Sequence, residues 1–587
     1  MLRLTYRLGG KMDFRCEKEI RTDVCIIGTG GTGLRAAIEA KRHGVEVLLV
    51  DKVVIGTNNN TRYSGGGLKA ALPGILSSAY TKIFDSPREH FEAALIHGEY
   101  LNDQELIETL CYDAPARVLE LKDFQVEHFR DMYLKVPYPH GTGIVKPLVE
   151  TVKRMGVKTK PGFVAVELIV RNGTVKGVWG FEIYSGNWTT VYAKSVVLAT
   201  GGAAEIFERN DTTANTTGDG YALAYRAGAT LRDMEIIQFE PYIQAEPDLP
   251  MMDRHECEAE FYGILRNKDG EDFLKNYMPP SKDELNAFHK QFGAHLTDIR
   301  ERVARAMAME VHEGRGDQGS VLFDLTHVPD EKWDADLASQ YTRKVLLRGF
   351  DVHKKPIHVF PGAICTLGGV LINPSTETEI KGLFAAGEVA GGVHGAARLG
   401  GDALAETIVY GARAGKGAAL HALSTAATKV LPRGKRIKTS VETILTNPPN
   451  AAGKPQMVKQ LIKSVMWRNA GLLRSEKGLV TALQEIEQIQ RENIPSLFAQ
   501  SYRDLREAVE VQNMALVAEM VTRSALMRQE SRGAHYRLDR PYRDDRNWLN
   551  NIFLYENRGG MGFRKEPIRL LKVKPQKISK FGLEVRG

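Results

Sequence analysis

A glycine-rich turn follows the first apolar segment of the chain. The sequence Gly28-Thr-Gly30-Gly31-Thr-Gly33 comes after apolar residues 24–27, and a second apolar segment, residues 45–50, ends at Asp51. In such a unit the first glycine permits a tight turn, the second lets the backbone approach a pyrophosphate, and the last lets the helix pack on the strand. The helix N-terminus offers N–H groups to phosphates, and Asp51 stands where a carboxylate would bind an adenosine ribose. We therefore predict a dinucleotide site.

The cysteines exclude several other kinds of site. The five cysteines are scattered singly, and no C-x-x-C pair is present. The sequence therefore predicts no metal site, neither zinc nor an iron–sulfur cluster, within this chain. An odd number of cysteines without a disulfide framework is typical of a reducing compartment.

Length and composition indicate an ordinary soluble protein of several domains. The chain has 587 residues, of which 43% are hydrophobic and 26% charged. No apolar run approaches the roughly 20 residues of a membrane span, and residues 1–21 lack the apolar region of a secretory signal. We expect a cytoplasmic protein without a direct membrane span, and a membrane-bound partner remains open.

The net charge of +7 lies in the C-terminal tail. Residues 558–587 contain nine Lys or Arg and two Glu, a balance of +7, so the rest of the chain is neutral overall. Such a tail could bind a membrane surface or an acidic protein, or it could be a solvated strand-and-loop segment that covers the body. Nucleic acid is not expected as a partner, because no basic helix or aromatic platform accompanies the tail.

The residue patterns divide the chain into segments that position these groups. Helical patterning covers residues 89–121, and residues 162–192 alternate like strands around an Asn172-Gly173 hairpin turn. Strand signals weaken after residue 240, and amphipathic helices follow at 455–468, 478–491 and 504–528. We expect a first dinucleotide-binding part at 20–239, an insertion at 240–352, a second dinucleotide-binding part at 353–432, a helical domain at 433–557 and the basic tail at 558–587.

Three further motifs point to a known family. They are residues 199–202 with 215–220, residues 382–390 with 394–404, and residues 530–535 with 544–548. In this order the chain resembles the flavoprotein subunit of the succinate dehydrogenase and fumarate reductase family over nearly its whole length. Aspartate oxidase and the adenylylsulfate reductase flavoprotein are more distant members.

The resemblance implies an α/β fold with FAD as cofactor. A Rossmann-like FAD-binding domain would carry an inserted α+β capping domain and a C-terminal helical domain. Glu388 would bind the ribityl chain, and Ala403 and Leu404 would present N–H groups to the flavin. The full set of residues implied to bind FAD is Gly28, Gly30, Gly31, Gly33, Asp51, Lys52, Thr61, Gly66, Thr200, Gly201, Asp219, Glu388, Arg398, Ala403 and Leu404.

The covalent attachment of FAD is one point of departure. Respiratory members attach FAD through a histidine in a Ser-His-Thr context, and the matching place here is Asn60-Thr61. Without an imidazole the bond cannot form. We therefore expect non-covalent FAD.

The substrate site departs further. The family motif Gln-Phe-His-Pro matches Gln-Phe-Glu240-Pro, so that Glu240 replaces a histidine that binds a substrate carboxylate, and Ile364 replaces a second histidine. The family's Thr-Glu pair matches His255-Glu256, which the resemblance places at the substrate. Three residues after the Glu of this pair the family has an arginine of its proton relay, and this chain has Ala259. The relay is then interrupted unless Arg254 takes the place of that arginine.

Two arginines keep their family positions. By resemblance, Arg300, paired through Glu256, passes a proton to or from the substrate, and Arg398 clamps a substrate carboxylate. The chain is then the flavoprotein subunit of a multi-subunit oxidoreductase acting on a C–C bond next to a carboxylate or acyl group. Its substrate would be a mono-carboxylate or acyl derivative with an apolar or cationic far end, in preference to fumarate or succinate.

A second hypothesis is a non-catalytic subunit whose FAD passes electrons between iron–sulfur partner chains. Under either hypothesis the resemblance implies that the partner is an iron–sulfur protein subunit, with a diffusible electron carrier as the alternative. Partner subunits could hold the chain at the inner face of a membrane.

Overall fold

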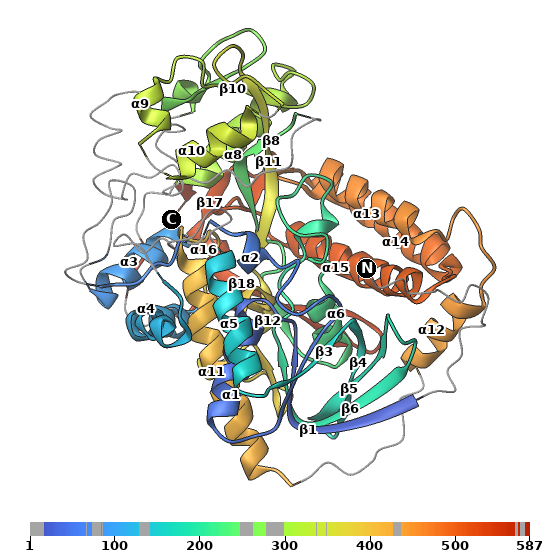
Figure 1. Cartoon of the computed structure of the whole chain (residues 1–587). Helices are drawn as coiled ribbons and strands as arrows, with labels where there is room; N and C mark the ends of the chain where they lie inside the picture. Colours follow the sequence, from blue (N-terminus) through green and yellow to red (C-terminus); the bar gives the residue numbers. More distant parts are fainter. Residues whose placement is uncertain are drawn as a thin grey trace.

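The computed structural model describes most of the chain. The described residues are 17–65, 67–72, 84, 86–127, 141–246, 262–277, 299–335, 337–347, 349–426, 436–569, 573–575 and 582–586. Gly66, Arg254, His255, Glu256 and Ala259 lie outside these ranges. Figure 1 shows three parts: a sheet with helices α1 and α11, a smaller unit above it around α8 to α10, and the helices α13 to α15 at one side.

The largest sheet has a parallel centre. Its order is β3 (Lys158–Pro161), β2 (Val47–Asp51), β1 (Glu17–Ile27), β6 (Trp188–Leu198), β5 (Thr174–Glu182) and β4 (Phe163–Arg171), and β13 (Leu383–Ala385) also pairs with β6. β1 runs parallel to both β2 and β6, so the carboxyl ends of these strands meet at one edge. Helices α1 (Gly31–Arg42) and α11 (Asp402–Ser424) pack against each other and against β1. The covered parts of these strands, residues 24–27 of β1 and 47–50 of β2, are buried and apolar, which explains the apolar runs of the sequence.

Two expected local structures are confirmed. Strands β4 and β5 form an antiparallel hairpin, and Asn172 and Gly173 between them have φ of 51° and 68°, as a type I′ turn requires. The expected helical region at 89–121 consists of two helices, α3 (Pro87–His97) and α4 (Gln104–Leu119). The side chains of Ser86 and Asp103 cap their N-termini.

The inserted segment forms a unit with its own hydrophobic core. Its antiparallel sheet has the order β8 (Ile237–Gln244), β11 (Ile357–Thr366), β10 (Val321–Asp324) and β9 (Ile264–Arg266). Helix α8 (Arg300–His312) packs on β8 and β11, and α9 (Asp330–Trp333) and α10 (Leu337–Leu346) follow. The core includes Phe273, Met307 and Trp333. β8 begins before residue 240 and β11 begins after residue 352, so the sheet of this capping unit extends beyond the expected insertion at both ends.

The C-terminal helices are α12 (Arg436–Thr446), α13 (Pro455–Ala470), α14 (Glu476–Gln488) and α15 (Tyr502–Met527). The side chains of Ser475 and Ser501 cap α14 and α15. Helices α13, α14 and α15 pack together, which confirms the amphipathic pattern of the sequence. Among the described residues, no helix combines the length and apolar character that a bilayer crossing needs.

The described residues of the basic tail form strands that pair with strands of the rest of the fold. A five-stranded sheet has the order β14 (Ala390–Gly391), β12 (Gly369–Leu371), β7 (Leu231–Arg232), β18 (Asn550–Asn557) and β19 (Gly560–Pro567). Strand β20 (Glu584–Arg586) pairs with β17 (Tyr542–Asp544). Tyr225 also donates a hydrogen bond to the carbonyl of Gly560 at 3.0 Å. These contacts favour the strand-and-loop interpretation of the tail.

A buried network of arginines and carboxylates joins the last motif to the rest of the fold. Arg528 donates to Glu235 Oε1 at 2.6 Å, and Arg532 donates to both Glu530 oxygens at 2.7 and 2.9 Å. The five fully buried arginines of this region are Arg474, Arg528, Arg532, Arg537 and Arg543. Because an unpaired buried charge is costly, we assign the motif at 530–535 a structural role.

Candidate functional site

The glycine-rich turn opens the N-terminus of α1 to a ligand. Gly28 has φ of +107°, and a Cβ there would lie 2.2 Å from the carbonyl oxygen of Ala199 at the end of β6. At Gly30, the N-cap of α1, the protein atom nearest to an added Cβ would be Thr61 Oγ1 at 3.7 Å. The turn is therefore closed on the side of the sheet and has room above Gly30. This is the arrangement that binds a pyrophosphate.

Asp51 stabilises the turn itself. Its Oδ2 accepts from the Thr29 backbone N at 2.7 Å and from Thr29 Oγ1 at 2.5 Å, and its Oδ1 accepts from Val53 N at 3.1 Å. Burial raises the pKa of this carboxyl group, and the hydrogen bonds from Thr29 oppose that shift. The binding of a ribose by Asp51 stays a prediction.

Thr61 lies beside the same turn. Its hydroxyl accepts from Gly31 N at 3.2 Å. The neighbouring Asn60, at the position of the family's attaching histidine, accepts from Thr213 N at 3.2 Å through Oδ1.

Lys52 and Asp219 form a buried cluster with helix α15. Lys52 Nζ lies 2.7 Å from both Asp219 Oδ2 and Glu510 Oε1, and Asn513 donates to Asp219 Oδ1 at 2.7 Å. Burial would raise the pKa of Asp219, but the charge of Lys52 and its hydrogen bond lower it overall. No local pattern indicated Glu510 and Asn513, because they come from the distant helical part.

Further polar groups lie between the glycine-rich turn and helix α11. Among the described residues, the buried Thr200 Oγ1 has no hydrogen-bond partner, and Gly201 follows it in the turn after β6, with φ of +74°. Glu388 Oε1 accepts from Thr366 N at 3.1 Å, and burial raises the pKa of Glu388 to about 7. A protonated carboxyl group there can donate to a ligand hydroxyl.

The first turn of α11 is the last part of the predicted cofactor site. Ala403 and Leu404 lie there, directly after Gly401 and Asp402. Asp402 is itself paired with the buried His90 at 2.8 Å. The free N–H groups of this helix end can bind an electron-rich edge of a ligand.

These residues fit FAD. The open turn at Gly30 suits the pyrophosphate, the unpartnered Thr200 hydroxyl and Glu388 suit sugar-like hydroxyl groups, and α11 presents N–H groups beyond them. When bound, FAD supplies two-electron hydride chemistry.

Glu240, Arg300 and Arg398 converge at the base of the capping unit. Arg300 is the first residue of α8, and its Nε lies 3.0 Å from Glu240 Oε2 on β8. Gln238, two residues earlier on β8, connects the other members: it accepts from Arg398 Nε at 3.0 Å and donates to Glu301 Oε1 at 2.6 Å. The structure thus brings both predicted arginines together.

The electrostatics of this cluster depend on its burial. Burial lowers the pKa of Arg398, the nearby charge of Arg300 lowers it further, and Cys365 and Glu240 oppose the shift. An unpaired carboxylate at position 240 would repel a substrate carboxylate. In the structure this charge is paired with Arg300, so the expected repulsion is partly offset. Gln238, which accepts from Arg398, and Glu301, which accepts from Gln238, were not among the predicted residues.

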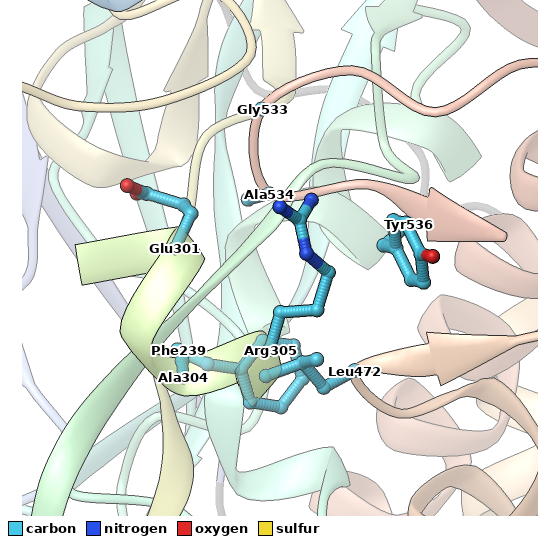
Figure 2. Close-up of a pocket in the computed structure, with 8 residues that line it drawn as sticks. All are labelled: Phe239, Glu301, Ala304, Arg305, Leu472, Gly533, Ala534 and Tyr536. Atoms are coloured by element: carbon cyan, nitrogen blue, oxygen red, sulfur yellow. The ribbon is translucent and has the colours of Figure 1, made fainter. Parts of the chain in front are cut away.

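A small pocket, partly open to solvent, lies beside this cluster. Figure 2 shows the Arg305 guanidinium near Ala534 with the Tyr536 ring beside it, whereas the Glu301 carboxylate points away from them. Arg305 Cζ is 4.8 Å from the centre of the Tyr536 ring. The second arginine of the α8 motif therefore faces the C-terminal part of the chain, and Arg300 faces the site. The pocket is lined by Phe239, Glu301, Ala304, Arg305, Leu472, Gly533, Ala534 and Tyr536.

Comparisons with known proteins agree with this geometry. The sequence matches the FAD binding domain family over residues 23–140 and 127–404, and the fumarate reductase flavoprotein C-terminal family over residues 459–580. It is 35% identical over 549 residues to a subunit of the fumarate reductase (CoM/CoB) of Methanothermobacter marburgensis, and the match covers 88% of this chain and 94% of that protein. It is 28% identical to the fumarate reductase flavoprotein subunit of Haemophilus influenzae, over 95% of this chain and 96% of that protein.

Solved structures show the same fold. A quinol-fumarate reductase structure with menaquinol superposes with a TM-score of 0.81 at 25% identity, over 95% of this chain and 100% of that chain. Mycobacterium smegmatis Sdh1 superposes with a TM-score of 0.79 at 29% identity, over 95% and 96%. This chain therefore belongs to the family of fumarate reductase and succinate dehydrogenase flavoprotein subunits, which are FAD-dependent oxidoreductases acting on CH–CH bonds.

Proposed function

We propose that this chain catalyses FAD-dependent hydride transfer to or from a C–C bond adjacent to a carboxylate or acyl group. The observation that supports this most is the convergence of Arg300 and Arg398 from different parts of the fold: Arg398 donates to Gln238, Gln238 donates to Glu301, and Glu301 is the residue next to Arg300. Arg398 binds the substrate carboxylate, since a guanidinium matches a carboxylate with two parallel hydrogen bonds. Arg300 exchanges the proton.

The charges of the site favour a substrate with a single negative charge. Glu240 already pairs with Arg300, which leaves Arg398 to bind one carboxylate, and Ile364 offers no hydrogen bond at the second histidine position. A charge-assisted hydrogen bond contributes about 1.5–3 kcal/mol. The loss of two histidine contacts should therefore weaken fumarate binding by more than about a hundredfold. We infer a mono-carboxylate or acyl substrate whose far end is apolar or cationic.

An iron–sulfur protein is the proposed electron-transfer partner. The described residues contain no cluster of His, Cys, Asp and Glu suited to hold a metal, and relatives of this chain are named as subunits. We propose that the complex lies in the cytoplasm, at the inner face of the membrane where its partner subunits are membrane-bound.

A stopped-flow experiment tests the proposed reaction. The holoprotein is reduced anaerobically with dithionite and mixed with fumarate, crotonate or acyl enoates while flavin absorbance is followed. We expect crotonate-type mono-anions or acyl enoates to reoxidise the flavin faster than fumarate. Arg300→Lys should remove this reaction, whereas Arg343→Lys, at a surface pair with Asp330 3.1 Å away in the same capping unit, should not. A flavin that no enoate reoxidises would favour the electron-relay hypothesis.

A further inference from the structure

The ion pair between Glu240 and Arg300 is held by two regular elements. Glu240 is paired with Gly362 in the β8–β11 ladder, and Arg300 begins α8, which packs on β8. The two side chains are 14% and 5% exposed, and Arg300 Nε is 3.0 Å from Glu240 Oε2. Because neither backbone segment is a free loop, this contact is a fixed part of the site.

A guanidinium that gives up a proton must regain one before the next turnover. The other two arginines at the start of α8 are engaged elsewhere: Arg302 donates to the carbonyl of Tyr277 at 2.6 Å, and Arg305 stacks on Tyr536. Residue 259, the position of the family's relay arginine, is alanine. Glu240 is a carboxyl group within ion-pair distance of Arg300, and its partial exposure lets it exchange protons with water.

We propose that Glu240 supplies the proton that Arg300 transfers, an inference that rests on the proposed function. On reduction, the substrate loses its C=C π bond and gains two C–H bonds, one from the hydride of the reduced cofactor and one from a proton of Arg300. The neutral guanidine then takes a proton from the Glu240 carboxyl group, which regains one from water. Oxidation runs through the same groups in reverse.

The charges around Glu240 couple its protonation to substrate binding. Among the described residues, Arg300 of α8 pairs with Glu240, and the other charged or titratable members of this cluster are Glu301 of α8, Arg398 from the segment before α11 and Cys365 of β11. An anion bound between the two arginines adds a negative charge next to Glu240. Since like charges disfavour each other's ionised form, Glu240 takes up one proton as the anion binds.

Proton uptake on anion binding tests the proposal without measuring turnover. The FAD-loaded protein is titrated with crotonate in weak buffer containing a pH indicator, and binding is followed by flavin absorbance. We expect about one proton taken up per anion at neutral pH in the wild type and none in Glu240→Gln. The matched control is Glu246→Gln, at a carboxylate that pairs with His358 at 2.9 Å beyond the end of β8, and it should behave like the wild type.

Two results separate the proposal from the proposed function. Binding of crotonate with equal proton uptake in the wild type and Glu240→Gln would overturn the role of Glu240 alone. No binding of any carboxylate would overturn the anion site, and the role of Glu240 with it.

A conservative variant keeps the test valid if Glu240→Gln is unstable. Glu240→Asp retains an ionisable group at a slightly larger distance from Arg300, so it should keep the proton uptake. The loss of a positioned proton-transfer group costs about 10²–10⁴-fold in rate. We expect flavin reoxidation by an enoate to be at least about 100-fold slower in Glu240→Gln and roughly tenfold slower in Glu240→Asp, with unchanged FAD content. Proton uptake that is absent in both the wild type and Glu240→Asp would contradict the proposal.

Discussion

Substitution of Gly30 by alanine separates cofactor binding from folding. The backbone at Gly30 has φ of −67° and ψ of −178°, which alanine adopts without strain, and the nearest protein atom to the new Cβ would be 3.7 Å away. Alanine is a poorer N-cap than glycine but loses less entropy on folding, and each effect is worth about 0.5–1 kcal/mol. The apoprotein should therefore keep its stability within about 1 kcal/mol.

In contrast to the stability of the apoprotein, the affinity for FAD should fall strongly in Gly30→Ala. A methyl group at Gly30 would occupy the space through which a pyrophosphate reaches the N–H groups of α1. The loss of one or two charge-assisted hydrogen bonds costs about 3 kcal/mol, which corresponds to a roughly 150-fold weaker Kd. At an FAD concentration of 100 times the wild-type Kd, the stabilisation by FAD should fall from about 2.7 to about 0.3 kcal/mol.

The assay is fluorescence titration of the apoprotein with FAD, together with chemical unfolding with and without FAD. Gly560→Ala is the matched control, because its nearest atom is also 3.7 Å from the added Cβ but it lies in β19. Wild-type FAD affinity in a folded Gly30→Ala variant would refute the placement of the pyrophosphate on this turn.

Three further predictions concern the cofactor and the substrate arginines. Because Asn60 stands in place of the attaching histidine, acid precipitation should leave the yellow flavin in the supernatant, and a fluorescent band on a denaturing gel would contradict non-covalent binding. Burial raises the pKa of Glu388 to about 7 from its ordinary value of 4.5, so the folded apoprotein retains a proton that the unfolded chain loses. The contribution of Glu388 to the free energy of unfolding, at most about 3 kcal/mol, is present below pH ~4.5 and is lost as pH rises through ~7. Urea unfolding of the apoprotein at several pH values should show this decline in the wild type and not in Glu388→Gln. Arg300→Lys should abolish flavin reoxidation by an enoate with FAD retained, because lysine cannot reproduce the guanidinium fork, whereas Arg398→Ala should mainly raise KM; equal effects on kcat and KM in the two variants would contradict this division of roles.

Local patterns in the sequence were sufficient to predict the backbone structure of the elements at the proposed cofactor site. The turn at Gly28, the hairpin at Asn172 and the capped helices depend on residues within a few positions of each other, through allowed backbone angles and side-chain caps. Apolar runs likewise identified the buried parallel strands. The family motifs added the proposed roles of Arg300 and Arg398, because each motif keeps its residue types at fixed spacing.

The charge of the substrate site depends on tertiary packing. Glu240 and Arg300 are 60 residues apart, and Gln238 and Arg398 are 160 apart, so no local rule relates them. Their contacts depend on how β8, α8 and the segment before α11 pack together. The same is true of Lys52 with Glu510 and of the arginines buried around Glu235. Residue types and their spacing established which groups could bind FAD and move a proton, whereas packing established which charges are paired, because the pairing of buried charges depends on distances that only the folded chain sets.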